Sequence, residues 1–148
     1  MRFCIQVVSQ AAVDIDGIRT ASIGRGMLVL LGIGKEDDET VADKMIAKLL
    51  KMRIFEDSNG KTNLSLADID GEMLLVSQFT LYADCRHGNR PSFTDSMGPA
   101  RAEELYNYVA DSIRPQVKKL DTGVFGADMK VSLINDGPFT VILDSADI

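Results

Sequence analysis

The stretch "GMLVLLGI", Gly26 to Ile33, decides the fold. It is apolar without the alternation of a strand that has one wet face, and such a run is typical of a strand buried on both faces. Three runs before it also have the composition of strands, and Asp16-Gly17 joins the last two as a tight hairpin. These runs are residues 2–8, 11–16 and 18–23. The first part of the chain is therefore predicted to form a sheet that includes one fully buried strand.

Two helices are predicted where the apolar residues change to a helical period. The first starts at Asp38, with Asp37 or Asp38 placed to cap its first turn, and its apolar stripe runs from Val41 to Leu50. The second starts at Pro99, a residue that suits the first turn of a helix. It ends at Arg114-Pro115, because proline stops a helix.

The remaining apolar runs are predicted to be strands. Glu72 to Tyr82 reads as one long strand, and residues 127–134 and 139–144 read as two strands joined by a turn at "NDGPFT", Asn135 to Thr140. No repeat, low-complexity run or change of composition marks a linker. The chain is thus predicted to be a single domain, residues 1–148, of the α+β class, mostly sheet with two helices.

The charge and the composition limit the partners. Sixteen Lys and Arg stand against twenty-two Asp and Glu, so the net charge is -6 and the pI is near 4.7. An acidic chain is not expected to grip DNA or RNA along its length, so any RNA contact should be local, with a shallow salt dependence. Cys4 and Cys85 are too few for a disulfide framework, and no leader peptide opens the sequence. No apolar run approaches the roughly 20 residues that span a bilayer. A cytoplasmic protein without membrane contact is predicted.

The common catalytic and cofactor motifs are missing. His87 is the only histidine, and with Cys4 and Cys85 it does not make a set of four zinc ligands. Gly32 and Gly34 follow a strand and precede a helix, but the third glycine of a dinucleotide loop is absent. We therefore predict neither a metal nor a cofactor.

A polar group of residues interrupts the predicted strand 72–82. Ser77, Gln78 and Thr80 surround Phe79, and buried polar groups need partners, since an unpaired one costs about 1 to 3 kcal/mol. In a strand, alternation would send Ser77 and Phe79 to one face and Gln78 and Thr80 to the other. Either these side chains line a pocket, or they only bond to neighbouring strands. Thr80 as a nucleophile would need a base, and the nearby sequence supplies none.

Two loops carry further candidates. In "CRHGNRPSF", residues 85–93, Arg86 and Arg90 suit a phosphate or ribose contact, while a solvated loop also explains them. In "NDGPFT", Asp136-Gly137 is sufficient for a turn, so Pro138, which removes a backbone donor, calls for another explanation.

Four motifs together resemble the D-aminoacyl-tRNA deacylases, also called D-tyrosyl-tRNA deacylases. They are "SQFTL" at 77–81, "RPSF" at 90–93, "FGADM" at 125–129 and "NDGPFT" at 135–140, and the likeness extends through essentially the whole chain. The resemblance implies a mostly β fold of mixed sheets packed in layers with two helices, and a homodimer. It also implies hydrolysis of the ester between a D-amino acid and the 3′ end of tRNA, or between glycine and a mischarged tRNA-Ala.

The resemblance also assigns roles to residues. Gly137-Pro138 would be cis and would enter the active site of the other subunit, where it excludes L-residues. Ser77, Gln78, Phe79 and Thr80 would surround the terminal adenosine and the ester. The family position of Thr80 suits a nucleophile, but we favour catalysis by main-chain N–H groups near Phe79 and Thr80 together with the ribose 2′-hydroxyl. Met129 is either a pocket wall or a core residue.

One position departs from the family pattern. The family commonly has Gln-Arg-Val near the start of the first strand, where this chain has Gln6-Val7-Val8. If that arginine orients the Gly-Pro segment, Val7 weakens the rejection of L-residues or of glycine. Two other interpretations stay open: a non-catalytic module that binds the aminoacylated 3′ end of tRNA, and a dimerisation module that is mostly sheet.

Overall fold

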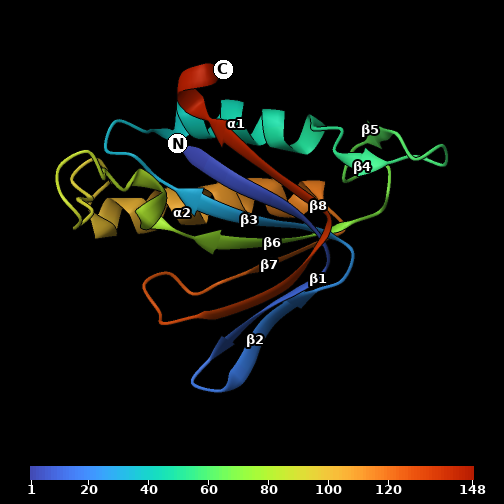
Figure 1. Cartoon of the computed structure of the whole chain (residues 1–148), viewed down its shortest axis with the longest axis horizontal. Helices are drawn as coiled ribbons and strands as arrows, with labels where there is room; N and C mark the ends of the chain where they lie inside the picture. Colours follow the sequence, from blue (N-terminus) through green and yellow to red (C-terminus); the bar gives the residue numbers. More distant parts are fainter.

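Two helices pack against one face of a mixed sheet in the computed structural model, which describes all residues from Met1 to Ile148 (Figure 1). The strands are β1 (Arg2–Ile15), β2 (Ile18–Ile23), β3 (Gly26–Gly32), β4 (Phe55–Glu56), β5 (Thr62–Leu64), β6 (Glu72–Ser77), β7 (Lys119–Thr122) and β8 (Lys130–Asp144). The helices are α1 (Glu39–Lys51) and α2 (Pro99–Ile113), and three 3-10 turns are η1 (Phe79–Tyr82), η2 (Arg114–Gln116) and η3 (Ser145–Asp147). The predicted α+β class, mostly β with two helices, is confirmed.

The central strand is β3, as its composition predicts. The strand order is β2-β1-β3-β6-β7, with β8 on β1, and β3 pairs antiparallel with β1 and parallel with β6. Met27, Val29 and Leu31 face a core shared with α1 and α2, while Leu28 faces a second apolar cluster on the other side. Both faces of β3 are therefore covered.

The two helices begin at the residues that the sequence indicates. The Asp38 carboxylate accepts a hydrogen bond from the Val41 N–H at 2.8 Å and caps α1, which satisfies a donor that the helix leaves free. Pro99 is the first residue of α2. Met45 and Leu49 of α1 and Leu105 and Val109 of α2 are buried against the sheet. Neither helix is long and apolar enough to cross a bilayer.

The second apolar cluster forms where β1 and β2 turn back across the sheet. Asp16 and Gly17 have positive φ, 50° and 75°, and make the predicted hairpin turn. Val13 of β1 and Ile23 of β2 then pack with Leu28 and Leu74, on the face that the helices leave open. The fold is thus layered, with helices, a sheet and the folded-over β1–β2 hairpin.

The prediction of separate strands at residues 2–8 and 11–16 was wrong, because one strand, β1, covers both. The prediction of a hairpin turn at 135–140 was also wrong. β8 runs from Lys130 to Asp144, and both of its halves pair antiparallel with β1. A hairpin would have reversed the chain direction between the halves. Instead the segment bulges: the step from Gln6 to Val8 on β1 lies opposite the step from Asn135 to Thr140 on β8.

The predicted long strand 72–82 is shorter than expected. β6 ends at Ser77, which pairs with Leu31, the next-to-last residue of β3. The Gln78 N–H donates to the Leu31 carbonyl at 2.7 Å, and further along the Leu81 and Ala83 N–H groups donate to the nearby carbonyls of Gln78 and Thr80. Residues 79–82 are therefore the 3-10 turn η1, and the alternation of faces expected for Ser77 to Thr80 was wrong.

Close contact between β3 and β6 makes Gly26 a position that tolerates no side chain. A methyl group there would overlap the backbone of Glu72. We expect Gly26→Ala to lower the free energy of unfolding by about 3 kcal/mol or more, because overpacked sites cost that order. Urea denaturation measures it. Gly98→Ala, at a glycine with open space and negative φ, is the control and should change stability by less than about 1 kcal/mol. Equal effects of the two substitutions would contradict the close packing.

Candidate active site

A cavity of about 590 Å³ lies where β3 and β6 end and α2 begins. Its lining is mostly apolar, ten of sixteen residues, with a few polar groups. The lining residues include Leu31 and Ile33, Val76 to Phe79, Ser96, Met97 and Pro99, and Phe125 to Met129. Such a cavity at the carboxyl ends of parallel strands is a common place for a ligand.

Tyr106 of α2 holds the inner wall of the cavity. Its hydroxyl donates to the Leu75 carbonyl at 2.9 Å, and the same carbonyl accepts from the Gly123 N–H at 2.9 Å. The ring of Phe125, which lines the cavity, lies 5.8 Å from the Tyr106 ring. Burial of the phenol raises the pKa of Tyr106 to about 12. Nothing in the helical spacing of Tyr106 shows what its hydroxyl bonds, so the sequence does not predict this contact.

Phe79 presents an aromatic face at the cavity. The residue is 56% exposed, which is unusual for a large apolar side chain, and its ring meets Phe93 edge-on at 5.0 Å. Ser77 and Gln78 beside it are half-buried and line the cavity. Met129 also lines the cavity and lies against Gly123, where an added Cβ would come within 2.7 Å of the Met129 sulfur. The structure therefore brings Ser77, Gln78, Phe79 and Met129 together.

Thr80 lies next to this group but does not line the cavity. Its hydroxyl accepts a hydrogen bond from Gln78 Nε2 at 2.5 Å, and no carboxylate, histidine or lysine bonds to it. The turn η1 makes its first hydrogen bond through the Leu81 N–H, so the N–H groups of Phe79 and Thr80 lie ahead of that bond. Two main-chain donors are thus available beside the exposed ring.

Arg2 supports η1 from behind. Its Nη1 donates to the Leu81 carbonyl at 2.9 Å, its Nε bonds to Asp144 at 2.6 Å, and its guanidinium lies 4.5 Å from the centre of the Tyr82 ring. The two ends of the chain therefore meet at this turn. The sequence carries no signal for this contact, because its partners are far apart along the chain.

The loop at 85–93 has less free charge than its sequence indicates. Arg86 forms two hydrogen bonds of 2.8 Å with the Asp84 carboxylate, and this arginine lowers the pKa of Asp84 to about 2. His87 and Arg90 are exposed, and Phe93 packs on Phe79. The structure brings together no group of three or more His, Cys, Asp or Glu side chains placed to hold a metal ion.

The bulge at 135–140 lies apart from the cavity of its own chain. Neither Gly137 nor Pro138 lines that cavity, and both are exposed. The Asn135 side chain closes the bulge: its Oδ1 accepts from the Phe139 N–H at 2.7 Å, and its Nδ2 donates to Thr140 Oγ1 at 2.9 Å. The bond between Gly137 and Pro138 is cis, and Gly137 has φ of 139°. Within one chain, the predicted site residues at 77–80 and those at 137–138 therefore do not line the same cavity.

Comparison with known proteins places these residues in a family. The family model "D-Tyr-tRNA(Tyr) deacylase" matches residues 4–144. The chain belongs to this family. A D-aminoacyl-tRNA deacylase of Thermosipho melanesiensis is 52% identical over 149 residues, which cover 100% of this chain and 99% of that protein. One of Lactobacillus acidophilus is 54% identical over 144 residues, 97% of this chain and 99% of that protein.

Two solved structures have a similar fold. A structure named "c-Myc DNA Unwinding Element Binding Protein" has a TM-score of 0.92 and 39% identity, and covers 97% of this chain and 98% of its own. A structure of "a probable eukaryotic D-amino acid tRNA deacylase" has a TM-score of 0.83 at 17% identity over 96% of this chain and 97% of its own. The second is a likeness of fold alone.

Val7 stands where the resemblance described above leads us to expect an arginine. It is buried in the core with the helices, 8% exposed, and it lies on β1 opposite the bulge, between Gln6 and Val8. It pairs with Met27 of β3. The valine side chain offers no hydrogen bond to the bulge. Asn135 closes the bulge through Phe139 and Thr140, and from β1 the Gln6 Nε2 donates to Thr140 Oγ1 at 3.4 Å.

The buried phenol of Tyr106 makes stability depend on alkaline pH. An unfolded tyrosine titrates near pH 10, whereas folding raises the pKa of Tyr106 to about 12. The neutral phenol therefore stabilises the fold fully below pH 10, and this contribution is lost as the pH rises from 10 through 12. We expect the free energy of unfolding in urea to fall over this range, with a shallower fall for Tyr106→Phe. At pH 7 the variant should lose about 1 kcal/mol, the usual worth of one hydrogen bond. Parallel pH curves for the two proteins would contradict this assignment.

Proposed function

We propose that this chain hydrolyses the ester bond of D-aminoacyl-tRNA and releases the D-amino acid and tRNA. The proposal is carried by one observation: a chain that matches the deacylase family over residues 4–144 forms a cavity from its motif residues Ser77, Gln78 and Phe79. Relatives at 52% and 54% identity over nearly the full length bear the name D-aminoacyl-tRNA deacylase. The cavity would take the terminal adenosine of the tRNA, with Phe79 as a face on which the base stacks.

The chemistry we propose uses the main chain and the RNA. No base lies within hydrogen-bond distance of the Thr80 hydroxyl, which argues against a side-chain nucleophile. The N–H groups of Phe79 and Thr80 would stabilise the negative charge that develops on the ester carbonyl oxygen. The ribose 2′-hydroxyl, adjacent to the ester, would help to activate it or a water molecule. The water oxygen bonds to the carbonyl carbon, and the tRNA 3′ oxygen leaves with a proton.

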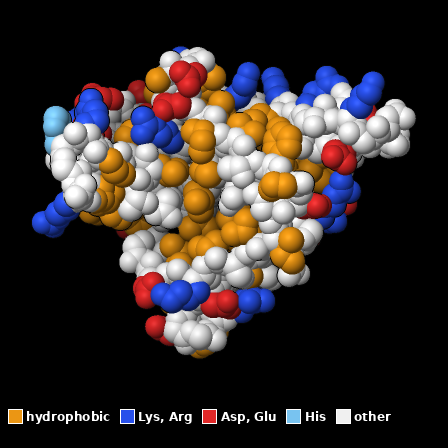
Figure 2. All heavy atoms as spheres, viewed as in Figure 1, with side chains coloured by type: hydrophobic (Ala, Val, Ile, Leu, Met, Phe, Trp, Pro, Cys, Tyr) orange, Lys and Arg blue, Asp and Glu red, His pale blue; other side chains and the backbone are white.

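Selection of D-residues would come from a second copy of the chain. The Gly137-Pro138 bulge is exposed and lies outside the cavity of its own chain, which favours a role in the cavity of a partner. β8 pairs with β1 along one edge only, and Ile134 and Ile142 on it are 52% and 60% exposed. Figure 2 shows apolar side chains gathered on the face that the helices leave open. Such an open edge and apolar face favour a homodimer.

The main chain of Gly137 and Pro138 would then leave no room for the side chain of an L-residue. A filter that works by exclusion accepts many D-residues, and it also passes glycine, including glycine mischarged on tRNA-Ala. Val7 gives the bulge no hydrogen bond, so we expect some cleavage of L-substrates. A single deacylase domain, 1–148, and a cytoplasmic location stay predictions.

A deacylation time course tests the proposal. Purified protein, without added metal, is incubated side by side with D-Tyr-tRNA, L-Tyr-tRNA and glycyl-tRNA-Ala, and the remaining ester is measured. We expect rapid loss of the D-Tyr ester and much slower loss of the L-Tyr ester. Binding of D-Tyr-tRNA without turnover would instead identify a non-catalytic module.

Substitution of Thr80 separates main-chain catalysis from a threonine nucleophile. We expect Thr80→Ala to keep kcat for D-Tyr-tRNA within about tenfold of the wild type, because the N–H groups remain. A single-turnover assay measures it. A loss on the order of 10⁴-fold or more, as for removal of a nucleophile, would make Thr80 the nucleophile.

Substitution of Gly137 tests the filter. With φ of 139°, an alanine here is strained, and its Cβ would lie 3.0 Å from the Phe139 nitrogen. We expect Gly137→Ala to lower the ratio of D-Tyr to L-Tyr cleavage rates at least tenfold. Gly17→Ala, also at positive φ but in the open turn of the β1–β2 hairpin, is the matched control and should leave the ratio unchanged. An unchanged ratio in Gly137→Ala would remove the bulge from the filter.

A further inference from the structure

Positive charge gathers on one part of this acidic chain. Residues 44–61 contain five cations, Lys44, Lys48, Lys51, Arg53 and Lys61, which we call the basic ridge, against two carboxylates, Glu56 and Asp57. This segment is thus +3 in a chain of net charge -6. All five side chains are exposed. Figure 2 shows Lys and Arg side chains along the upper edge of the molecule, over α1 and toward β4 and β5.

The cations of the basic ridge are free of ion pairs. Eight of the sixteen Lys and Arg residues of the chain form an ion pair, and none of these eight belongs to the ridge. The nearby Asp57 carboxylate is used in the β4–β5 turn, where it accepts from the N–H groups of Asn59 and Lys61. Arg53 is fixed by a 2.6 Å hydrogen bond from its Nε to the Asn63 carbonyl. None of the five ridge cations therefore forms an ion pair in the chain, and the four lysine ammonium groups make no side-chain hydrogen bond.

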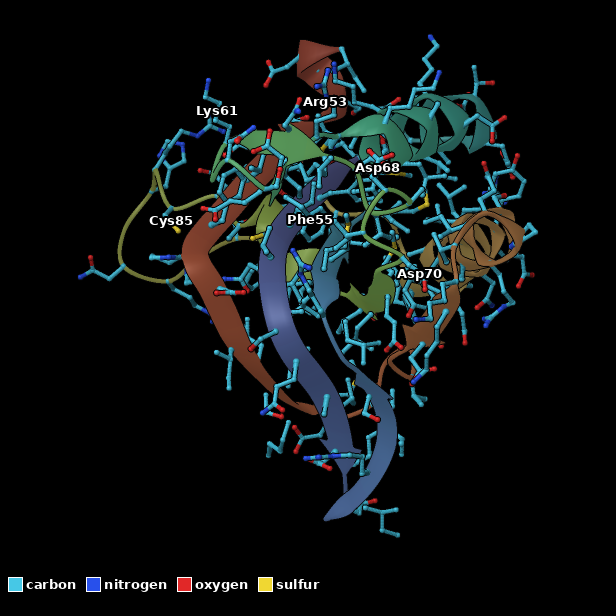
Figure 3. The ribbon with its side chains drawn as sticks, turned by 90° about the vertical axis from the view of Figure 1, so that its right-hand side faces the viewer. Arg53, Phe55, Lys61, Asp68, Asp70 and Cys85 are labelled. Atoms are coloured by element: carbon cyan, nitrogen blue, oxygen red, sulfur yellow. The ribbon has the colours of Figure 1, made fainter.

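Helix electrostatics explains only a part of the ridge. Lys48 and Lys51 lie in the last turn of α1, where cations interact favourably with the helix dipole. Lys44 lies earlier in the helix, and Arg53 and Lys61 lie outside it. Figure 3 shows Arg53 and Lys61 on the same upper side of the molecule. The buried residues of α1, Ala42, Met45, Ile46 and Leu49, face the core, so the helix has no exposed apolar stripe for a membrane surface.

Helix α1 connects the cavity side of the molecule with the basic ridge. Gly34, shortly before α1, forms a β-bridge with Ser96, a cavity residue, so α1 starts on the cavity side. The thirteen residues of α1 extend about 20 Å, at about 1.5 Å per residue. A nucleic-acid duplex covers that length in about six base pairs, at about 3.4 Å each for DNA.

We propose that the basic ridge binds the phosphate backbone of RNA, as the docking surface for the double-helical stem of the tRNA whose 3′ end occupies the cavity. This inference rests on the proposed function. Net charge alone predicts contact with the last nucleotides only and a shallow dependence on salt. The ridge adds phosphate contacts that no base sequence specifies, so it serves tRNAs of many sequences equally.

A pair of triple variants tests the ridge. The ridge variant is K48Q/K51Q/K61Q, and the control is R19Q/R25Q/K118Q, which removes the same charge from exposed residues elsewhere. Arg19 and Lys118 form exposed ion pairs with Asp14 and Asp70, and exposed pairs contribute only about 0 to 1 kcal/mol to stability. Each protein is assayed with D-Tyr-tRNA and with D-tyrosyl-adenosine, which has the ester and the nucleoside but no stem. Rates are measured at several salt concentrations.

We expect the ridge variant to raise KM for D-Tyr-tRNA about tenfold or more at low salt, with kcat unchanged. The slope of log(kcat/KM) against log[salt] should become shallower by about 2, since each phosphate contact contributes about 0.7 to 0.9. Cleavage of D-tyrosyl-adenosine should equal that of the wild type. The control should match the wild type on both substrates.

A ridge variant that matches the control on D-Tyr-tRNA would overturn the inference while leaving the proposed function intact. If the ridge variant loses D-tyrosyl-adenosine cleavage as well, its fold has suffered, and the single variants K48Q and K61Q decide by the same KM measurement. If the wild type cleaves neither ester, the proposed function fails. In that case the affinity for labelled uncharged tRNA is measured for both variants. Equal affinity of the ridge variant and the control would overturn the proposal that the ridge binds RNA.

Discussion

The parallel pairing of β3 with β6 is the constraint on which the rest of the site depends. Gly26 brings the two strands into backbone contact at one end, and the pairing stops at Leu31 and Ser77 at the other. Because the ladder stops there, the chain leaves the sheet as the turn η1. The cavity lies at this end, and the exposed Phe79 ring and two main-chain donors stand at its edge. A longer β6 would have returned those donors to the sheet.

The site is built for positioning rather than for reactive side chains. Arg2 bonds to the Leu81 carbonyl and Tyr106 to the Leu75 carbonyl, so the segment from Leu75 to Leu81 is held at both ends by side chains from other elements. The hydroxyl of Thr80 has a hydrogen bond only with the Gln78 side chain. We therefore propose that backbone geometry and the RNA carry out the chemistry, and that the bulge of a second chain selects the substrate.

The sequence predicts those structural features that are set by residues adjacent along the chain. Four features follow from a few adjacent side chains and were predicted: a cap at Asp37 or Asp38, of which the structure uses Asp38, the first helical residue Pro99, the hairpin at Asp16-Gly17 and the buried strand from Gly26. The end of β6 was missed because it depends on where β3 ends. The bulge at 135–140 was mistaken for a turn, since Asp-Gly suits both, and only pairing of both halves with β1 distinguishes them. The supports from Arg2 and Tyr106 join residues far apart along the chain and leave no local signal. The site motifs were found through a family resemblance, which spacing alone does not supply.

Main-chain catalysis with a filter from a second chain can be observed in a crystal structure of the protein with a non-hydrolysable analogue, D-tyrosine joined by an amide to 3′-amino-adenosine. The account predicts the adenosine in the cavity of one chain, the carbonyl oxygen within hydrogen-bond distance of the Phe79 or Thr80 N–H, and Gly137-Pro138 of a second chain against the Cα of the tyrosine. An analogue bound elsewhere, or held in the cavity with no second chain near it, would contradict the account.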